Sequence, residues 1–254
     1  FCLEGRSWRK DFYLPYKANR KVTMDQRTVR EQEDDELYFE AYDDFITFIK
    51  EKTNSTVLRH PQAEADDMIA MWIQQHPDDE HIIVSTDSDF YQLLAPNVIQ
   101  YNGTTDEIVS LEGFKSAKTG EWVKDKKTGE KKEPINPEYT LFEKCVRGDP
   151  TDNIFSAYPG ARKKGSKNKT GIIEAFEDRE AGGFNYNNFM LQRWTDHNDL
   201  EHRVRDDFIR NQILIDLTQQ PDELKVSFIE SINESLQKPK VNNVGFAWMK
   251  FCAK

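Results

Sequence analysis

Residue types that mark disulfide-bonded and zinc-binding proteins are scarce in this sequence. Its 254 residues include three cysteines and five histidines. Cys2, Cys145 and Cys252 lie far apart and form no Cys-x-x-Cys pair, and the histidines show no His-x-x-x-His spacing. The pattern argues against a disulfide framework and a zinc site, and it favours a reducing compartment such as the cytoplasm.

Long apolar runs are also absent. No stretch of about 18 apolar residues is present, so the sequence predicts no membrane-spanning helix, and no signal peptide is visible. The composition is 37% hydrophobic and 31% charged, with 16 phenylalanines and five tryptophans available for a core. We expect a polar but globular protein without a membrane partner, built as one large α/β domain or as two smaller domains.

The charge is unevenly distributed along the chain. The formal net charge is −10, which by itself argues against a nucleic-acid partner. Residues 1–30, however, contain eight basic and three acidic side chains, and residues 161–169 contain five basic side chains and no acidic one. Because basic segments of this kind can hold phosphate groups, nucleic acid stays a candidate partner.

Strand and helix patterns alternate in the first part of the chain. Residues 56–59, 81–85 and 97–101 have strand character, and residues 63–75 and 139–147 have helical character. The continuous apolar run of residues 81–85 is typical of a strand that is buried on both faces of a parallel sheet. The alternation predicts an α/β fold.

Other segments have weaker patterns. Residues 37–49 repeat apolar side chains at helical spacing, and residues 112–137 are rich in lysine, glycine and threonine. The latter predict a surface insertion with a turn at Lys127-Thr128-Gly129. The last hundred residues look mainly helical, with a helix expected at residues 200–217 and a glycine- and asparagine-rich loop at residues 182–188.

Acidic residues gather in three short clusters, each at the beginning or end of an expected element. The clusters are Glu64-Ala65-Asp66-Asp67, Asp87-Ser88-Asp89 and Asp149-Pro150-Thr151-Asp152. Carboxylates so close together repel one another unless protons or cations lie between them. Brought together, these carboxylates would form an oxygen-rich pocket for hard divalent metals such as Mg²⁺ or Mn²⁺. Two such metals about 4 Å apart can cut phosphodiesters, so the clusters point towards metal-dependent phosphate chemistry.

Each cluster also has a simpler structural interpretation. Acidic residues are favoured at helix N-termini, so the first cluster could cap a helix, and Asp149 could begin a capped turn after a helix stop at Gly148. An Asp-x-Asp sequence also occurs in simple turns. The three clusters together are more specific than any one of them, and Asp87 and Asp89 directly follow a strand, where ligand sites of parallel α/β sheets lie.

The three clusters, taken in order with the segment Asn211–Leu217, resemble the flap endonuclease or 5′ nuclease superfamily. Within that superfamily, the chain is most similar to the bacteriophage 5′→3′ exonucleases and the phage-type ribonuclease H. The segments Ser7–Phe12 and Pro15–Arg20 strengthen the resemblance, which runs from Leu3 to about Leu217. No second family explains all of these segments.

The resemblance implies a fold and a division into domains. We expect an α/β fold with a PIN-like, mostly parallel sheet flanked by helices, a helical arch at about residues 14–50 and a C-terminal helix–three-turn–helix region that binds DNA. Residues 1–147 would form the nuclease domain, with the insertion at about residues 112–137, and residues 148–254 the mainly helical DNA-binding region. The family's first strand carries an Asp and has no counterpart here, whereas residues 1–5 resemble the end of a buried strand. We therefore expect a missing N-terminal strand upstream.

The resemblance also implies which carboxylates bind two divalent metals, Mg²⁺ or Mn²⁺. The first metal would be held by Glu64, Asp66, Asp67 and Asp87. The second would be held by Asp89, Asp149 and Asp152, with Asp87 between both. Glu4 stands where the family usually has an Asp, and its longer side chain would change the metal spacing. The family's helix–three-turn–helix also typically holds a monovalent cation, although here an extended segment, residues 162–170, follows the turn.

Basic and aromatic residues complete the implied site. Lys17 matches the family's lysine at the base of the arch, which contacts the scissile phosphate, and Arg20 would support it one turn later on the same helix. Tyr16 matches an aromatic residue that stacks on a terminal nucleobase, although a packed helix tyrosine is an equally good interpretation. Further substrate contacts are expected from Arg9, Lys10, Arg162, Lys163, Lys164, Lys167 and Lys169.

The implied function is that of a metal-dependent, structure-specific 5′ nuclease, a 5′→3′ exonuclease or flap endonuclease of phage DNA replication. Its substrates would be DNA with a 5′ flap or nick and RNA–DNA hybrids such as RNA primers. We expect a monomer in the cytoplasm of the infected host, with a polymerase or a single-strand-binding protein as a further partner. The sequence does not decide between endonuclease and exonuclease preference, or between RNA and DNA.

Three alternatives stay open on the sequence. A non-catalytic nucleic-acid-binding protein of the same fold would owe its inactivity to the missing strand and to Glu4. A nucleotide-sugar transferase built around Asp87-Ser88-Asp89 would not need Lys17, Asp149 or Asp152. A single-strand ribonuclease of the PIN type would share the acidic pocket, but such domains usually lack the second basic segment.

Overall fold

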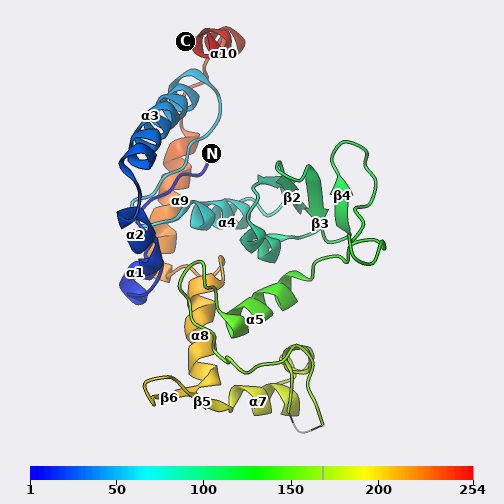
Figure 1. The fold of residues 1–254 in the computed structure, drawn as a ribbon. Coiled ribbons are helices and arrows are strands. Elements are labelled where there is room, and N and C mark those ends of the chain that lie inside the picture. The colour runs from blue at the N-terminus through cyan, green and yellow to red at the C-terminus, as the bar shows by residue number, and fades with distance from the viewer. Residues whose placement is uncertain (168, 254) are drawn as a thin grey trace. The chain divides into compact units, whose positions relative to one another are not determined.

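The computed structural model of the chain describes residues 1–167 and 169–253. The chain forms two compact units, the first containing Phe1–Gln75 and Gln220–Lys254 and the second His76–Gln219, and Figure 1 gives the order of their elements. The predicted boundary after residue 147 falls inside the second unit, so the division into residues 1–147 and 148–254 stays a prediction. No helix in the described part of the chain is long and apolar enough to cross a membrane.

Helices make up most of the first unit. They are α1 (Arg9–Phe12), α2 (Ala18–Asp25), α3 (Val29–Lys52), α4 (Ala65–Gln75), α9 (Asp222–Leu236) and α10 (Val244–Cys252). The start of α3 is a capping box, in which Thr28 Oγ1 accepts a hydrogen bond from Glu31 N at 3.3 Å and the Glu31 carboxylate accepts one from Thr28 N at 2.8 Å. Helix α4 packs against α9, and α10 packs against α3.

The N-terminal segment pairs with residues 56–58 of the same unit. Cys2 forms an isolated parallel bridge with Leu58, Leu58 N donates to Phe1 O at 2.8 Å, and Leu3 N donates to Leu58 O at 2.9 Å. The expected strand character of residues 1–5 and 56–59 is therefore present only as a bridge. The chain leaves this pairing at Gly5, where a Cβ atom would lie 2.0 Å from the carbonyl oxygen of His60, so only glycine fits.

The second unit contains a four-stranded sheet. Its strands follow the order β1 (His81–Val84), β2 (Val98–Asn102), β3 (Glu107–Ser110) and β4 (Gly113–Ser116). Only β1 and β2 are parallel, while the pairs β2–β3 and β3–β4 are antiparallel. The sheet is thus mixed rather than mostly parallel. The connections at residues 103–106 and 111–112 are too short for the crossover that parallel neighbours need.

Burial alternates along β1. His81 and Ile83 are buried, whereas Ile82 and Val84 are 64% and 74% exposed. The prediction that this strand is buried on both faces is therefore wrong. A run of aliphatic residues favours a strand whether one face of the sheet or both faces are buried. The run therefore does not show that both faces are covered.

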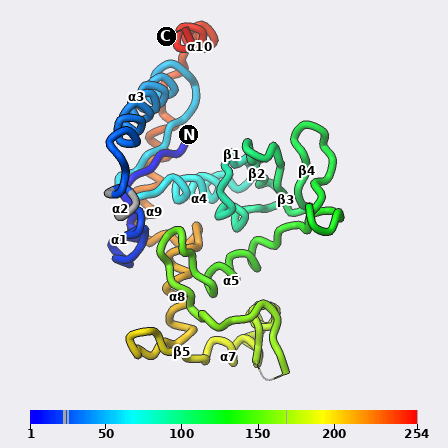
Figure 2. The backbone as a smooth tube through the Cα atoms, viewed as in Figure 1, coloured from blue at the N-terminus to red at the C-terminus, as the bar shows by residue number. Residues whose placement is uncertain are grey.

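The remaining elements of the second unit are the short helix η1 between β1 and β2 and the helices and strands that follow β4. They are η1 (Ser88–Leu93), α5 (Pro137–Arg147), α6 (Ile172–Glu177), α7 (Phe184–Met190), β5 (Arg193–Thr195), β6 (Glu201–Arg203) and α8 (Val204–Ile215). The predicted insertion begins with β4 and continues as a looped segment before α5 (Figure 2). Its turn is present as expected, because Gly129 N donates to Asp125 O at 2.9 Å.

Two expectations for the last hundred residues need correction. Residues 182–188 are not a loop throughout, because α7 begins at Phe184, where the Asp178 carboxylate accepts a hydrogen bond from Asn185 N at 2.7 Å. The helix expected at residues 200–217 begins only at Val204, because the preceding residues form β6 and pair with β5. Local capping and strand pairing decide both boundaries.

Candidate functional site

The first acidic cluster, defined here as Glu64, Asp66 and Asp67, lies at the start of α4 in the first unit. Glu64 is only 5% exposed. Its Oε2 atom accepts hydrogen bonds from Ser7 Oγ at 2.8 Å, from Tyr16 Oη at 2.8 Å and from Arg9 Nη1 at 3.2 Å, and its Oε1 atom pairs with Lys17 Nζ. This carboxylate is therefore held by a shell of donors.

Asp67 and Arg9 form a buried ion pair at the base of this cluster. Arg9 Nη1 donates to Asp67 Oδ2 at 2.9 Å, and Arg9 Nη2 lies 2.8 Å from Asp67 Oδ1. Asp67 Oδ2 also accepts a hydrogen bond from Glu64 N at 3.0 Å, so the capping interpretation is right for Asp67. Asp67 is 0% and Arg9 1% exposed. The expected substrate contact from Arg9 needs correction, because its guanidinium neutralises buried carboxylates; Lys10 beside it is exposed.

The pKa values of the first unit follow from this pairing. Burial alone would raise the pKa of Glu64, but the charges of Lys17 and Arg9 outweigh it and lower the pKa below its ordinary value. Glu4 lies at the end of the N-terminal pairing and keeps an exposed side chain. The pKa of its carboxyl is raised, first by partial desolvation and then by the Glu64 carboxylate, so Glu4 feels the charge of the first cluster.

Lys17 and Tyr16 lie in the turn before α2. The backbone of Lys17 is left-handed, with φ of 54°, a conformation that is uncommon outside glycine. Tyr16 is 4% exposed, and its hydroxyl is bonded to Glu64. The packed-tyrosine interpretation is therefore the right one in this structure, and the expected base stacking needs correction. The expectation that Lys17 and Arg20 share one helix is also wrong, because only Arg20 lies in α2, where its side chain is exposed.

The second acidic cluster, defined as Asp87, Asp89, Asp149 and Asp152, lies in the second unit. Asp87 precedes η1, and its Oδ1 atom accepts a hydrogen bond from Asp89 N at 2.9 Å. Gln100 on β2 is fully buried, and its amide donates to Ser85 O and to Asp87 O, both at 2.8 Å. Gln100 was not predicted as a site residue. It fixes the backbone that carries Asp87 and Asp89 at the end of β1.

A tight loop presents Asp149 and Asp152. Asp149 N donates to Ile154 O and Ile154 N donates to Asp149 O, both at 2.8 Å, while Asp149 Oδ1 accepts a hydrogen bond from Thr151 N at 2.8 Å. Gly148, with φ of 73°, starts the loop, and a Cβ atom there would lie 2.3 Å from Ile154 O. The side chain of Asn211 is fully buried in α8 and donates to Cys145 O at 2.9 Å and to Phe155 O at 2.8 Å. It thereby ties the loop to the end of α5.

Lys144 on α5 connects the two parts of the second cluster, which are Asp87 with Asp89 and Asp149 with Asp152. Its Nζ atom pairs with Asp89 Oδ1 and lies 2.9 Å from Asp149 Oδ2. Burial raises the pKa of Asp89 despite this pairing, whereas the bond and charge of Lys144 outweigh burial and lower the pKa of Asp149. Burial would lower the pKa of Lys144, but its two carboxylate partners raise it. Lys144 was not predicted as a site residue, because a lysine in the last turn of a helix is usually explained by the helix dipole.

The donor chemistry of the clusters fits a divalent cation. Asp89 and Asp149 already place two carboxylate oxygens around one positive charge, the ammonium of Lys144, and oxygen donors are those that Mg²⁺ and Mn²⁺ prefer. Within residues 1–167 and 169–253, however, no group of three or more histidine, cysteine, aspartate or glutamate side chains has an arrangement that could hold a metal ion. Their carboxylate oxygens are paired instead with Arg9, Lys17 and Lys144.

The basic segment, defined as residues 162–167 and 169, lies in the second unit beside α6. The side chains of its five predicted contact residues are exposed: Arg162, Lys163, Lys164, Lys167 and Lys169. Glu174 holds the segment, because its carboxylate accepts hydrogen bonds from Gly165 N and Gly171 N, both at 3.0 Å. The segment is therefore anchored through its backbone, which leaves the basic side chains available.

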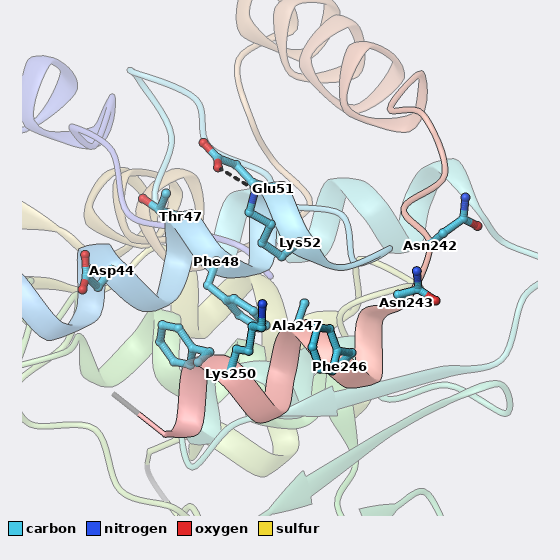
Figure 3. A pocket seen from close by; sticks show the side chains of 11 residues that line it. Asp44, Thr47, Phe48, Glu51, Lys52, Asn242, Asn243, Phe246, Ala247 and Lys250 are labelled. Atoms are coloured by element: carbon cyan, nitrogen blue, oxygen red, sulfur yellow. Dashed lines mark ion pairs between the residues drawn. The ribbon is translucent and has the colours of Figure 1, made fainter.

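A pocket of about 440 Å³ lies between α3 and α10 in the first unit (Figure 3). Phe48 and Phe251 stack there with ring centroids 4.4 Å apart, and Phe246 lies beside them in the lining. The lining contains no residue of either acidic cluster and none of the predicted substrate contacts. Its position argues for helix packing rather than for the chemistry of the clusters.

Comparison with known proteins supports the family resemblance. Residues 1–124 match the family model of the 5′-3′ exonuclease N-terminal resolvase-like domain. The ribonuclease H of Enterobacteria phage T4 is 27% identical over 254 residues, which cover 94% of this chain and 70% of that protein. A DNA polymerase I of Caldicellulosiruptor bescii is 27% identical over 191 residues, which cover 71% of this chain but 18% of the polymerase.

Solved structures share the fold. A flap endonuclease of bacteriophage T5, in a complex with DNA and metal ions, matches with a TM-score of 0.61 at 22% identity, over 92% of this chain and 82% of that chain. The T5 5′-exonuclease with bound zinc matches with a TM-score of 0.58 at 23% identity, over 92% and 78%. The chain thus has a mixed α/β fold like that of the T5 5′-exonuclease, and the predicted resemblance to the 5′ nuclease superfamily is confirmed.

Proposed function

We propose, from its similarity to the 5′ nuclease superfamily, that this chain is a structure-specific 5′ nuclease that hydrolyses phosphodiesters. Similar proteins are a ribonuclease H and a flap endonuclease, and the latter was solved with DNA. The observation that carries the proposal is that the family's acidic motifs form two clusters, each with a lysine ammonium paired to its carboxylates. Such clusters attract cations and can present them to a phosphate.

The proposed cofactors are two Mg²⁺ or Mn²⁺ ions. When bound, such an ion supplies a Lewis acid and an activated water for attack on the phosphodiester. The residues proposed to hold them are Glu64, Asp66, Asp87, Asp89, Asp149 and Asp152, with Glu4 as a further candidate. Asp67 would act indirectly, because both of its oxygens already face Arg9. A monovalent cation in the helix–three-turn–helix remains part of the proposal that the family implies.

Lys17 is the proposed catalytic cation, supported by Arg20. Negative charge builds on the phosphate oxygens during hydrolysis, and an ammonium fixed near them stabilises that charge more in the transition state than in the ground state. Without substrate, Lys17 Nζ is paired with Glu64. We therefore propose that Glu64 positions the Lys17 ammonium until a phosphate replaces part of this pairing.

The basic segment and Lys10 are the proposed contacts for the nucleic-acid backbone. Their side chains are exposed, and they are positive in a chain whose net charge is −10. Contacts of this kind position a duplex without reading its sequence. The proposed substrates are DNA with a 5′ flap or nick and RNA–DNA hybrid in phage replication. The helical arch, the helix–three-turn–helix region, a monomeric state and a polymerase or single-strand-binding partner belong to the same proposal.

A cleavage assay with matched substrates tests the proposal. The full chain is incubated with a labelled 5′-flap duplex, a nicked duplex and a blunt duplex, each with Mg²⁺ and with EDTA. We expect cleavage close to the flap junction. This cleavage should require the metal, and Asp87→Ala should abolish it. If the folded chain binds the flap but does not cut it with Mg²⁺ or Mn²⁺, the non-catalytic alternative is the right one.

A further inference from the structure

Lys144 is the cation at the centre of the second acidic cluster. Its ammonium is in contact with Asp89 and lies 2.9 Å from Asp149 Oδ2. The side chains of the three residues are 22%, 25% and 12% exposed, so solvent reaches the group only in part. One positive charge therefore pairs with two carboxylates, Asp89 and Asp149, that lie far apart in the sequence.

Both partners of Lys144 are held by backbone interactions that do not depend on the lysine. Asp89 follows the loop that Gln100 binds, and Asp149 lies in the loop closed by its two hydrogen bonds with Ile154. The two carboxylates thus have limited freedom to move apart. Carboxylates confined in this way repel each other, and a cation between them removes the repulsion.

Lysine and arginine differ in how firmly they occupy such a position. Arg9 in the first cluster is 1% exposed and bonds to two carboxylates through a planar fork. Lys144 carries its charge on a flexible four-carbon stem and lies partly open to solvent. Its ammonium can therefore leave the carboxylates by rotation of its own side chain.

We propose that Lys144 is a built-in counter-cation that occupies the place of a divalent cation between Asp89 and Asp149 and leaves when that cation binds. The inference rests on the proposed function, because it assigns Asp89 and Asp149 to a metal site. Two consequences follow. Lys144 stabilises the second unit when no metal is present, and it weakens metal binding, because the cation must displace an ammonium.

Metal titration of a charge-removing variant tests this inference. Lys144→Met nearly keeps the length of the side chain and removes its charge, whereas Lys144→Arg keeps the charge. Arg147→Met is the matched control, because it removes one positive charge from the same helix, where Arg147 pairs with Glu143 and not with the cluster. Binding of Mn²⁺ alone to the full chain is measured by isothermal titration calorimetry, and thermal unfolding is measured in EDTA and in Mn²⁺.

We expect Lys144→Met to bind Mn²⁺ about tenfold more tightly than the unmodified chain, since an ammonium no longer competes with or repels the ion. We also expect it to unfold at a lower temperature in EDTA and to recover most of the difference in Mn²⁺. Lys144→Arg and Arg147→Met should leave the affinity within about twofold. If Lys144→Met does not fold in EDTA, Lys144→Gln, which is also uncharged but keeps a hydrogen-bond donor, takes its place.

The outcomes separate this inference from the proposed function. Equal or weaker Mn²⁺ affinity in Lys144→Met, while the unmodified chain cuts flaps with Mg²⁺, overturns the inference and leaves the nuclease proposal intact. An equal gain in Mn²⁺ affinity in Arg147→Met also overturns it, because the gain would then come from removing any positive charge from this helix. A gain confined to Lys144→Met supports it, whether or not flaps are cut. If neither the unmodified chain nor Lys144→Met binds Mn²⁺ and no flap is cut, both proposals fail.

Discussion

The two acidic clusters differ in what neutralises them. In the first, Glu64 and Asp67 are 5% and 0% exposed and share the buried guanidinium of Arg9. In the second, Asp89 and Asp149 share one lysine ammonium and lie closer to solvent. The comparison indicates that the first cluster contributes to the stability of its unit, whereas we propose that the cation of the second cluster can be exchanged. Similar sequence motifs thus serve two different physical roles.

The largest expected effect concerns turnover in the second cluster. The double variant Asp149→Asn, Asp152→Asn removes negative charge and nearly preserves shape, so we expect flap binding to survive and cleavage to fall by about three orders of magnitude or more. Single-turnover cleavage and flap binding measure the two effects. Asp125→Asn is the matched control, because Asp125 accepts hydrogen bonds from Lys127 N and Thr128 N in a similar turn. Near-normal cleavage by the double variant would contradict the two-metal proposal.

The next effect concerns stability in the first cluster. Arg9→Met leaves two buried carboxylates without their shared cation, which should lower the free energy of unfolding by about 3–5 kcal/mol. Urea unfolding without metal measures it. Lys10→Met is the control, because the adjacent side chain is exposed and should change stability by less than about 0.5 kcal/mol. Equal stability of the two variants would remove the distinction between the clusters.

Substitution of Lys17 tests whether the first cluster also contributes to catalysis. Lys17→Ala should reduce single-turnover cleavage by roughly 10²–10³-fold, as for the loss of one positioned electrostatic donor. Duplex binding should change much less, and Lys17→Arg should restore activity only in part, because its planar fork does not reproduce an ammonium. A variant that binds weakly but cuts at the normal rate once saturated would reassign Lys17 to substrate capture.

The basic segment provides a comparison outside both clusters. Replacing Lys163, Lys164, Lys167 and Lys169 by alanine should weaken binding and flatten the dependence of log affinity on log salt by up to about four units of slope. Fluorescence anisotropy on a duplex between low and moderate salt measures the slope. The cleavage rate of the variant should stay close to normal when it is saturated with substrate. An unchanged slope would show that these lysines do not touch phosphates.

The smallest expected effect is a pH dependence of the first cluster. The folded pKa of Glu64 lies below its ordinary value of 4.5, so its ionised form is favoured by folding. Its contribution to stability is therefore full above that ordinary value and is lost as the pH falls through the lowered folded pKa. Glu64→Gln should flatten the loss of stability in this acidic range, as measured by urea unfolding at successive pH values. A parallel pH profile for both proteins would show that Glu64 contributes nothing to acid sensitivity.

Part of this protein could be predicted from local patterns. The helix at residues 139–147 and the strands at residues 81–85 and 97–101 lie close to α5, β1 and β2, because apolar spacing, caps and breakers act over a few residues. The acidic motifs were also recognisable, since their residues are close in sequence. The extent of α7 was not predicted, because a cap from Asp178 and buried packing outweighed its glycine- and asparagine-rich composition.

The amino-acid sequence by itself determined the α/β character and the order of the acidic motifs. Only the tertiary structure decided that Arg9 and Tyr16 turn inwards to Glu64, that Gln100 supports Asp87, and that Lys144 joins Asp89 to Asp149. The physical reason is that a charged side chain has no fixed role of its own. Whether it contacts substrate, caps a helix or neutralises a buried partner depends on which charges the fold brings within a few ångströms and how much water it leaves between them.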